Sequence, residues 1–228
     1  MSDWRVETLG EDALLLRFGD RIDAALNRRV HALAADIAAQ RPPWLCDVVP
    51  AYATLALFVD RFAFPTSADP LHEAERWLEA QAFGTDAETV AVEQRVVDIP
   101  VRYGGEDGPD LEAVAAHAGL SVQDLVARHS AGDYSVAMLG FAAGFPYLLG
   151  MDAALAMPRL DTPRTRVAAG SIGIGGAQTG IYPRQGPGGW RIIGRTTLPL
   201  FDAVRMPPTL LAPGDRVRFV VDPASTSR

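Results

Sequence analysis

The chain has 228 residues, of which 48% are hydrophobic, and its mean hydropathy of +0.07 is typical of a globular protein. Its net charge of −7 argues against a nucleic-acid partner, because neutralising phosphates requires a surplus of Lys and Arg. One cysteine, Cys46, excludes an intrachain disulfide framework, and no apolar run approaches the roughly 18 residues of a membrane span. We therefore expect a cytoplasmic protein with no nucleic-acid and no membrane partner.

Strand and helix patterns alternate in the first part of the chain. Asp23 and the pair Asp69 and Pro70 are helix-start signals, because a capping side chain or a proline is favoured at the first positions of a helix. Short apolar runs predict strands. The predicted elements are a strand at 13–18, a helix from Asp23 to the prolines at 42–43, strands at 44–49 and 51–59, and a helix from Asp69 that buries Leu71, Ala74, Leu78 and Ala82. This order favours a small antiparallel sheet with helices on one face.

The second part of the chain changes to two helices followed by short β segments. We place a domain boundary near residues 83–88, which gives domains 1–86 and 87–228, although the strand at 89–101 fits either side. The predicted elements are helices at 110–119 and 121–132, the second with a Ser121 cap and Gly132 as its stop, and strands at 134–140, 166–174, 179–182, 190–195 and 216–221. Strands spaced by Gly and Pro turns predict a barrel or a closed β-sandwich.

Glycine is concentrated in one segment, where 12 of the chain's 21 glycines lie between Gly140 and Gly194. Because glycine loses much backbone entropy on folding, such a run indicates tight turns or close backbone approach. A phosphate-loop frame starting at Gly175 fails, since Ile181 stands where lysine must reach the phosphates. A dinucleotide-binding frame fails as well. Two interpretations stay open: backbone amides that hold an anion, and plain tight turns.

Arginines and aromatic residues lie between the glycines of the same segment. Arg164 and Arg195 are flanked by glycine or proline, and a guanidinium suits a carboxylate or a phosphate, with surface solvation as the alternative. Phe145, Tyr147 and Trp190 are candidates for the wall of a pocket, and core packing explains them equally well. The combination indicates a binding site.

The four histidines have no metal-ligand spacing, so we assign no metal site. His129 is the histidine that precedes the glycine-rich segment. It shares one predicted helical face with Val122, Leu125 and Val126. It is therefore either a hydrogen-bonded core histidine or a proton-transfer group at the mouth of a pocket.

Several blocks of sequence carry a resemblance to one family. They read IPVRYGGEDGPDLEAVAAHAGLSVQDLVARHSAGDY, MLGFAAGFPYLLGMD, PRLDTPRTRVAAGSIGIGGAQTGIYP, GPGGWRIIGRTTLPLFD and PPTLLAPGDRVRF. Together they closely resemble the family of the 5-oxoprolinase B subunit, also known as allophanate hydrolase subunit 1, which includes the Kip-type inhibitor of a sporulation kinase. The resemblance is strong over residues 99–219 and looser before them. Departures such as Leu149, where the family usually has glycine, concern loop shape.

The resemblance implies an α+β fold: a small N-terminal α/β sandwich domain followed by a cyclophilin-like β-barrel domain. It also implies one component of an ATP-dependent 5-oxoprolinase that hydrolyses 5-oxo-L-proline to L-glutamate and is active only as a multi-subunit complex. The expected partners are a C-subunit homologue with a related barrel and an A-subunit homologue. ATP, with Mg²⁺, is the expected co-substrate. Because the chain has no ATP motif of its own, we expect a site shared with the C-subunit homologue.

Within this site we assign His129 and Arg195 as catalytic. Arg164 and Arg195 are expected to hold an anionic group, either the substrate carboxylate or a phosphate. The residues expected to bind substrate are Phe145, Tyr147, Arg164, Gln178, Thr179, Tyr182 and Trp190. Two other functions stay open: a Kip-type inhibitor that docks on a histidine kinase through an apolar patch, and one half of a biotin-dependent, urea-type carboxyltransferase.

Overall fold

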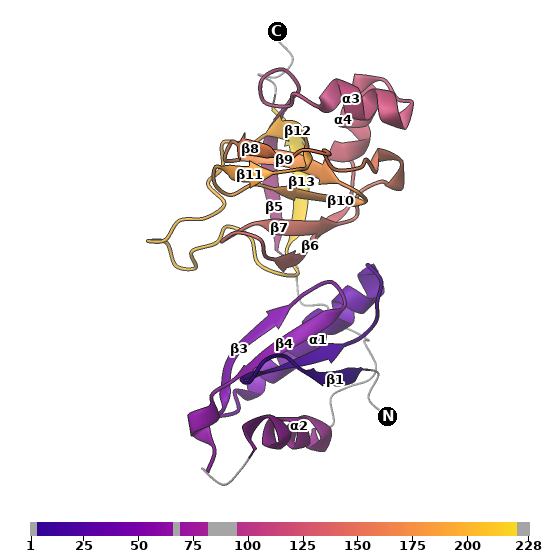
Figure 1. Ribbon diagram of the computed structural model, residues 1–228. Helices are drawn as coiled ribbons and strands as arrows, with labels where there is room; N and C mark the ends of the chain where they lie inside the picture. The colour runs from indigo at the N-terminus through magenta and orange to yellow at the C-terminus, as the bar shows by residue number, and fades with distance from the viewer. Residues whose placement is uncertain (1–3, 66–68, 82–94, 223–228) are drawn as a thin grey trace. The chain divides into compact units, whose positions relative to one another are not determined.

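The computed structural model describes residues 4–65, 69–81 and 95–222, and the chain forms two compact units, Met1–Val92 and Glu93–Arg228 (Figure 1). Each unit has a hydrophobic core of its own. The domain boundary that we predicted at residues 83–88 lies outside the described residues, as does Ala82. No described helix is long and apolar enough to cross a membrane.

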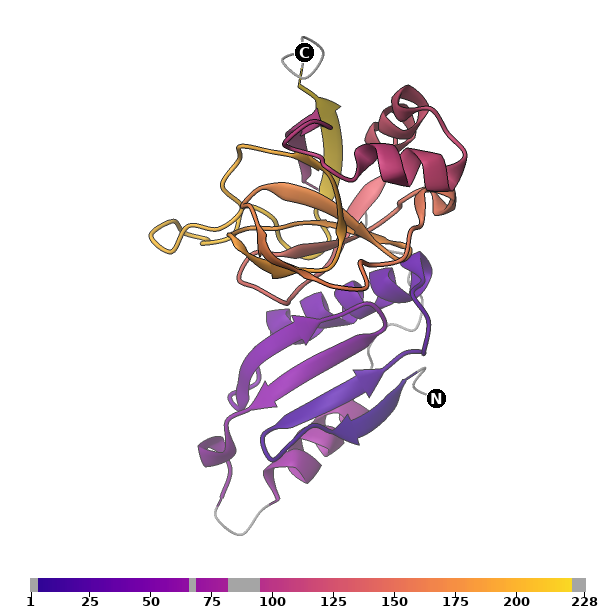
Figure 2. The ribbon, with the colours of Figure 1, turned by 45° about the horizontal axis from the view of Figure 1, so that its top comes forward.

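The described part of the N-terminal unit is a four-stranded antiparallel sheet in the order β1-β2-β4-β3. Its elements are β1 (Arg5–Thr8), β2 (Ala13–Arg17), α1 (Ala24–Gln40), β3 (Leu45–Pro50), β4 (Thr54–Val59), a 3₁₀ turn (Arg61–Ala63) and α2 (Pro70–Ala80). Both helices lie behind the sheet in Figure 2. The predicted antiparallel sheet with helices on one face is confirmed. Strand β1 escaped prediction, because its sequence RVET is polar and half-exposed.

The core of this unit is built by every second residue of the strands and by one face of each helix, where buried residues recur about every 3.6 positions. On β4, alternate residues such as Leu55 and Leu57 are fully buried, and they share one cluster with Val30 and Ile37 of α1. The carboxylate of Asp23 accepts hydrogen bonds from the first backbone amides of α1. The predicted cap is therefore confirmed, and it sets the start of the helix that covers the sheet.

Leu57→Ala tests this core. The side chain is fully buried in the middle of β4, so its loss should leave a cavity and lower the free energy of unfolding by about 2 to 5 kcal/mol. Urea denaturation followed by circular dichroism measures the change. Leu9→Ala, at a leucine that is half-exposed, is the control and should change stability by less than about 0.5 kcal/mol. Equal losses in the two variants would contradict the assigned core.

The described part of the C-terminal unit is a closed barrel of seven strands in the order β10-β7-β6-β13-β5-β12-β9, which β9 closes by pairing with β10. The strands β8 and β11 form a separate two-stranded sheet. The bounds are β5 (Val96–Tyr103), α3 (Leu111–Ala118), α4 (Val122–Ser130), β6 (Tyr134–Leu139), β7 (Pro146–Leu149), a 3₁₀ turn (Ala153–Leu155), β8 (Arg164–Val167), β9 (Ser171–Gly175), β10 (Gln178–Ile181), β11 (Gly186–Gly188), β12 (Arg191–Arg195) and β13 (Arg216–Val221). The fold class predicted from the sequence is confirmed.

The C-terminal unit differs from the predicted strand list in three places. The predicted strand at 166–174 is two strands, because Gly170 turns the chain with a φ of +80° and a Cβ there would overlap the carbonyl oxygen of Thr196. Strands β7 and β11 were missed, since proline and glycine mask them in the sequence. The first residues of the predicted strand at 89–101 lie outside the described residues.

Helices α3 and α4 lie side by side at one end of the barrel (Figure 1). The predicted cap of α4 is present, because the backbone amide of Asp124 donates to Ser121 Oγ at 3.0 Å. The predicted stop at Gly132 is wrong. Helix α4 ends at Ser130, and Gly132 has no left-handed backbone. A Cβ at Gly132 would lie 2.5 Å from the Tyr134 ring, so this glycine makes room for a side chain.

Candidate functional site

Five aromatic rings of the described chain gather against the barrel wall formed by β7, β9 and β10. Phe145 is at their centre, with ring centroids 4.9 Å from Tyr147, 5.2 Å from Tyr182 and 5.5 Å from Trp190. The fifth ring, Phe141, lies 5.4 Å from Phe145. Most of these contacts are edge-to-face, which is a favourable geometry for aromatic pairs. We call these five residues the aromatic cluster.

The aromatic cluster lies on the outer face of the barrel. In β9, Ile172 and Ile174 belong to the barrel core, so the alternate residues Gly173 and Gly175 face outward. A Cβ on Gly175 would lie 2.5 Å from Trp190 Nε1. In β10, a Cβ on Gly180 would lie 2.6 Å from a backbone oxygen of β7 and 3.0 Å from the Phe145 ring.

Close packing therefore explains part of the glycine-rich run. Gly173, Gly175 and Gly180 lie in paired strands of the barrel rather than in an open loop. Of the two interpretations left open by the sequence, the geometry favours close backbone approach and tight turns. The rings of Trp190 and Phe145 occupy the space where side chains at Gly175 and Gly180 would lie.

Gly175→Ala should disturb this packing. The added methyl meets the Trp190 ring inside a filled layer, so we expect the free energy of unfolding to fall by about 1 to 3 kcal/mol. The matched control is Gly186→Ala, because no atom lies within 4 Å of the position of its Cβ and its backbone is outside the left-handed region. Chemical denaturation of both variants provides the comparison. Wild-type stability in Gly175→Ala would show that the rings do not depend on this glycine.

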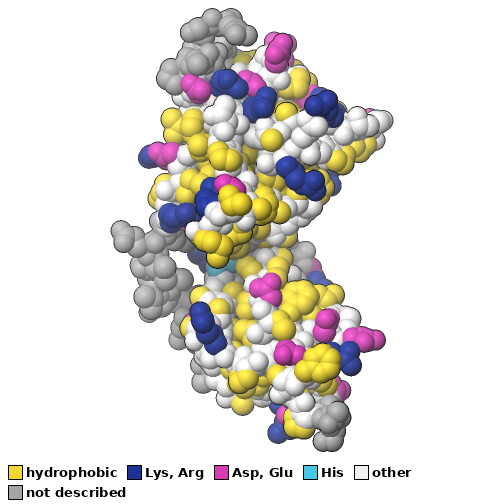
Figure 3. All heavy atoms as spheres, turned by 90° about the vertical axis from the view of Figure 1, so that its left-hand side faces the viewer, with side chains coloured by type: hydrophobic (Ala, Val, Ile, Leu, Met, Phe, Trp, Pro, Cys, Tyr) yellow, Lys and Arg dark blue, Asp and Glu magenta, His cyan; other side chains and the backbone are white. Residues whose placement is uncertain are grey.

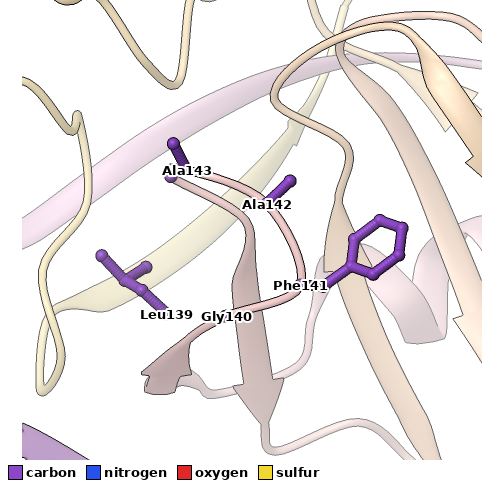
Figure 4. A pocket seen from close by; sticks show the side chains of 6 residues that line it. Leu139, Gly140, Phe141, Ala142 and Ala143 are labelled. Carbon is purple, nitrogen blue, oxygen red and sulfur yellow. The ribbon is translucent and has the colours of Figure 1, made fainter.

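The exposed edge of the aromatic cluster is formed by residues that the sequence did not single out as site residues. Phe141 is 65% exposed and has a φ of +64°, a strained conformation for a residue other than glycine. Its loop, residues 139–144, lines a shallow hollow, in which the Phe141 ring points away from Leu139 (Figure 4). Arg159 lies over the Trp190 ring, with its guanidinium carbon 5.8 Å from the centroid. A single sequence carries no signal for either arrangement.

The tyrosine hydroxyls of the aromatic cluster are neutral at neutral pH. Burial raises the pKa of Tyr147, and the charge of Arg159 opposes that shift. Burial also raises the pKa of Tyr182, against a hydrogen bond with the Trp190 backbone. Both hydroxyls are therefore hydrogen-bonding groups rather than bases.

Arg164 is held beside the aromatic cluster by an ion pair. Its Nη1 and Nη2 donate to the two carboxylate oxygens of Asp110 at 2.9 and 2.8 Å, and Asp110 is buried. Asp110 also accepts a hydrogen bond from the Ile192 amide at 2.6 Å. The pair therefore joins β8, the start of α3 and β12. An anionic ligand of Arg164 would have to compete with this buried, bidentate partner.

Arg195 lies elsewhere on the barrel, paired across β12 and β5 with Arg102. Both arginines face Asp107, at 3.6 Å from Arg195 Nη1 and 3.0 Å from Arg102 Nε. Arg195 Nε also donates to the Ala169 carbonyl at 3.0 Å. These two arginines and one aspartate carry one net positive charge at a partly exposed position. Since the pairs of Arg164 and Arg195 use different carboxylates, the structure does not bring the two guanidinium groups to one carboxylate.

His129 lies inside the barrel core and is fully buried. Its ring is 4.6 Å from that of Phe219, and its Nδ1 is 2.7 Å from the Tyr103 hydroxyl. Its Nε2 is 3.4 Å from Thr179 Oγ1, which donates to the Gly173 carbonyl. This pattern fits a neutral imidazole with its proton on Nε2 and with Tyr103 donating to Nδ1. Burial lowers the pKa of His129 to about 3, so the ring is uncharged at neutral pH.

The His129→Gln variant separates a structural from a catalytic histidine. In the unfolded chain the imidazole binds a proton below a pH of about 6.5, whereas the folded chain excludes that proton until about pH 3. The wild type should therefore lose stability as the pH falls through this window, by up to about 1.4 kcal/mol per pH unit. Glutamine does not titrate, so the variant lacks this pH-dependent contribution to the free energy of unfolding. We expect the variant to be about 1 to 3 kcal/mol less stable at pH 8, and this gap to shrink toward pH 4.

The control measurement for this variant is turnover by the assembled, folded complex. Near-normal stability at pH 8 with a large loss of turnover would contradict the structural role and support the predicted proton-transfer role. Thermal unfolding from pH 4 to 8 supplies the stability curve, and the other histidines cancel in the comparison between the two proteins.

The predicted site residues thus fall in four places. Phe145, Tyr147, Tyr182 and Trp190 meet in the aromatic cluster, with Arg164 beside them. Other predicted residues are separate: His129 and Thr179 lie in the barrel interior, Gln178 begins β10 opposite Gly175, and Arg195 pairs with Asp107. Their assigned roles stay predictions.

The chain corresponds to a known class of protein, because residues 4–211 match the family model of the carboxyltransferase domain, subdomain C and D. A protein named as the 5-oxoprolinase B subunit, from Bacillus subtilis (strain 168), is 44% identical over 95% of this chain and 92% of its own length. Its namesake from Escherichia coli O157:H7 is 41% identical over 95% of both chains. The chain belongs to the family of the 5-oxoprolinase B subunit, which confirms the resemblance predicted from the sequence.

A solved structure shares the fold over most of the chain. The crystal structure of TTHA0988 matches 92% of this chain with a TM-score of 0.77 and 40% sequence identity. The present chain spans 40% of the length of that crystallised chain. In that protein, the matching region is therefore one part of a longer polypeptide.

Proposed function

We propose that the chain is one component of an ATP-dependent 5-oxoprolinase, which hydrolyses 5-oxo-L-proline to L-glutamate at a site shared with a C-subunit homologue. The observation that carries this proposal is the 44% identity, over nearly the whole length, to a protein named as the 5-oxoprolinase B subunit. A protein with such a name works together with other subunits. The partners in this proposal are the C-subunit homologue and an A-subunit homologue.

The exposed edge of the aromatic cluster suits the substrate chemically. 5-Oxoproline is a five-membered lactam with one carboxylate, so it needs an apolar surface for the ring, a hydrogen-bonding group for the amide and a cation. Phe141 and Tyr147 supply ring surface and a neutral hydroxyl, and the guanidinium of Arg159 is exposed above Trp190. We assign this edge as the contribution of this chain to the shared site.

Arginines take two different roles in the proposal. Arg164 is a positioning residue, because its ion pair with Asp110 fixes the segment that leads into Trp190 and β12. Arg195 remains our candidate for a second anionic group, either a carboxylate or a phosphate, since it shares one carboxylate with Arg102. The two candidate cations, Arg159 and Arg195, are tested separately below.

We assign no residue of this chain to Mg·ATP. Within residues 4–65, 69–81 and 95–222, no group of three or more His, Cys, Asp or Glu side chains is arranged to hold a metal ion. The outward-facing glycines Gly173, Gly175 and Gly180 pack under aromatic rings rather than cradling a phosphate. We derive no step through the nucleotide in this chain, and we assign its binding to another part of the complex.

Turnover of 5-oxoproline with ATP, measured with purified partners with and without this chain, tests the proposal. Arg159→Ala and Arg195→Ala should each lower kcat/KM by roughly 30- to 1,000-fold, which corresponds to about 2 to 4 kcal/mol of lost transition-state stabilisation. The control is Arg218→Ala on β13, whose ion pair with Asp98 is exposed, and it should keep the parental rate. Full turnover without this chain would refute the function, and full turnover in one arginine variant would remove that arginine from the site.

The family model also favours a second candidate, one half of a biotin-dependent carboxyltransferase, because the matching domain carries that description. A carboxyltransferase needs a biotinylated protein as its carboxyl donor. Transfer of ¹⁴C-labelled carboxyl groups from such a protein, together with inactivity toward 5-oxoproline, would decide for this alternative.

A further inference from the structure

A hairpin projects from the barrel between β12 and β13, at the left in Figure 1 and Figure 2. At its base, the amide of Leu210 donates to the Leu200 carbonyl at 2.8 Å. One step further out, the amide of Asp202 donates to the Pro208 carbonyl, also at 2.8 Å. Residues 201–209 therefore form an ordered protrusion, which we call the projecting hairpin.

The polar groups near the tip are used within the projecting hairpin. The carboxylate of Asp202 accepts a hydrogen bond from the Val204 amide at 3.0 Å. The guanidinium of Arg205 donates to the carbonyls of Pro207 and Pro208 at 3.2 and 3.1 Å. These hydrogen bonds are made within the hairpin and stabilise its tip. The side chains that the tip exposes to solvent are mainly apolar.

Two of those apolar side chains are almost fully exposed: Val204 at 91% and Met206 at 90%. Phe201, at the base, is also exposed in part. In Figure 3, which faces the side from which the projecting hairpin extends, hydrophobic side chains are exposed on this unit among charged ones. Folded proteins rarely leave contiguous apolar surface in water unless it contacts a partner.

The projecting hairpin adjoins the candidate site. A Cβ on Gly144 would lie 3.1 Å from Phe201 Cβ, so the base of the hairpin touches the 139–144 loop. The same loop carries Phe141 and lines the hollow of Figure 4. A partner that covers the tip therefore approaches the exposed edge of the aromatic cluster, as a shared site requires.

We propose that the projecting hairpin inserts Val204 and Met206 into an apolar cleft of the C-subunit homologue, and this inference rests on the proposed 5-oxoprolinase function. Two findings favour a different polypeptide of the complex over a second copy of this chain. The relatives are named as one of several subunits, and in TTHA0988 the matching region is joined to a longer polypeptide. Because the side chains that the tip presents, Val204 and Met206, are apolar, the cleft that receives them is apolar rather than charged.

Binding of the purified C-subunit homologue to this chain, measured by isothermal titration calorimetry, tests the inference. Met206→Asp and Val204→Asp should each raise the Kd at least roughly tenfold, since an interface anchor would then carry a charge into an apolar cleft. Met206→Leu should bind like the wild type. The matched control is Phe62→Asp, at a phenylalanine of the N-terminal unit that is 97% exposed, and its Kd should not change. Circular dichroism and thermal unfolding verify that each variant is folded.

Three results would overturn the inference. One is an unchanged Kd in the folded Met206→Asp and Val204→Asp variants, and another is an equal loss of binding in Phe62→Asp. The third is self-association of the isolated chain that Met206→Asp abolishes, because the occupant would then be a second copy. Turnover of 5-oxoproline by the wild-type complex is measured in parallel. If the wild-type complex turns over 5-oxoproline while the hairpin variants bind normally, the docking inference fails and the proposed function stands. If the hairpin variants lose binding while the wild-type complex shows no turnover, the proposed function alone fails.

Discussion

Aromatic rings packed directly on glycine backbone are the contact on which the outer face of the barrel depends. With no side chains at Gly175 and Gly180, Trp190 and Phe145 approach the strands closely enough to form a second packed layer outside the barrel core. That layer reaches from β7 to β12, and it leaves Phe141 exposed at its edge. The glycines that first indicated a ligand loop thus serve the proposed binding surface indirectly, because they leave room for the ring layer at whose edge that surface lies.

A second constraint comes from the loop between β5 and α3. Its two aspartates each hold an arginine from a different strand: Asp107 faces Arg195 on β12, and Asp110 grips Arg164 on β8. Asp110 makes no cap hydrogen bond to its own helix, because its carboxylate oxygens are occupied by Arg164 and the Ile192 amide. Through Asp110, this short loop therefore ties β8 of the small sheet to the barrel strand β12. It also decides which positive charge stays available to a ligand.

Local signals in the sequence predicted much of the fold. The Gly and Pro turns between short β-like segments located β13 at its observed bounds, and the cap signals of Asp23 and Ser121 located the starts of two helices. What the sequence could not supply were contacts between distant residues. The partner of Arg164 lies 54 positions away, and Thr179 meets His129 across 50 positions. The sequence also did not show which side chains of a strand point into the barrel and which point out. A strand as rich in glycine as β9 shows too little alternation between apolar and polar residues for that prediction.

The parallel pairing of β5 with β13 has a consequence for the order in which the chain can fold during synthesis. The described strand pairs of the N-terminal unit lie within residues 5–59, so this sheet can form while the ribosome is still translating the barrel. The barrel instead joins residues 96–101 to residues 216–221 and cannot close before its last strand has emerged. Until then β5 and β6 expose unpaired edges. The nascent barrel is thus the stage at which this protein depends most on protection from aggregation.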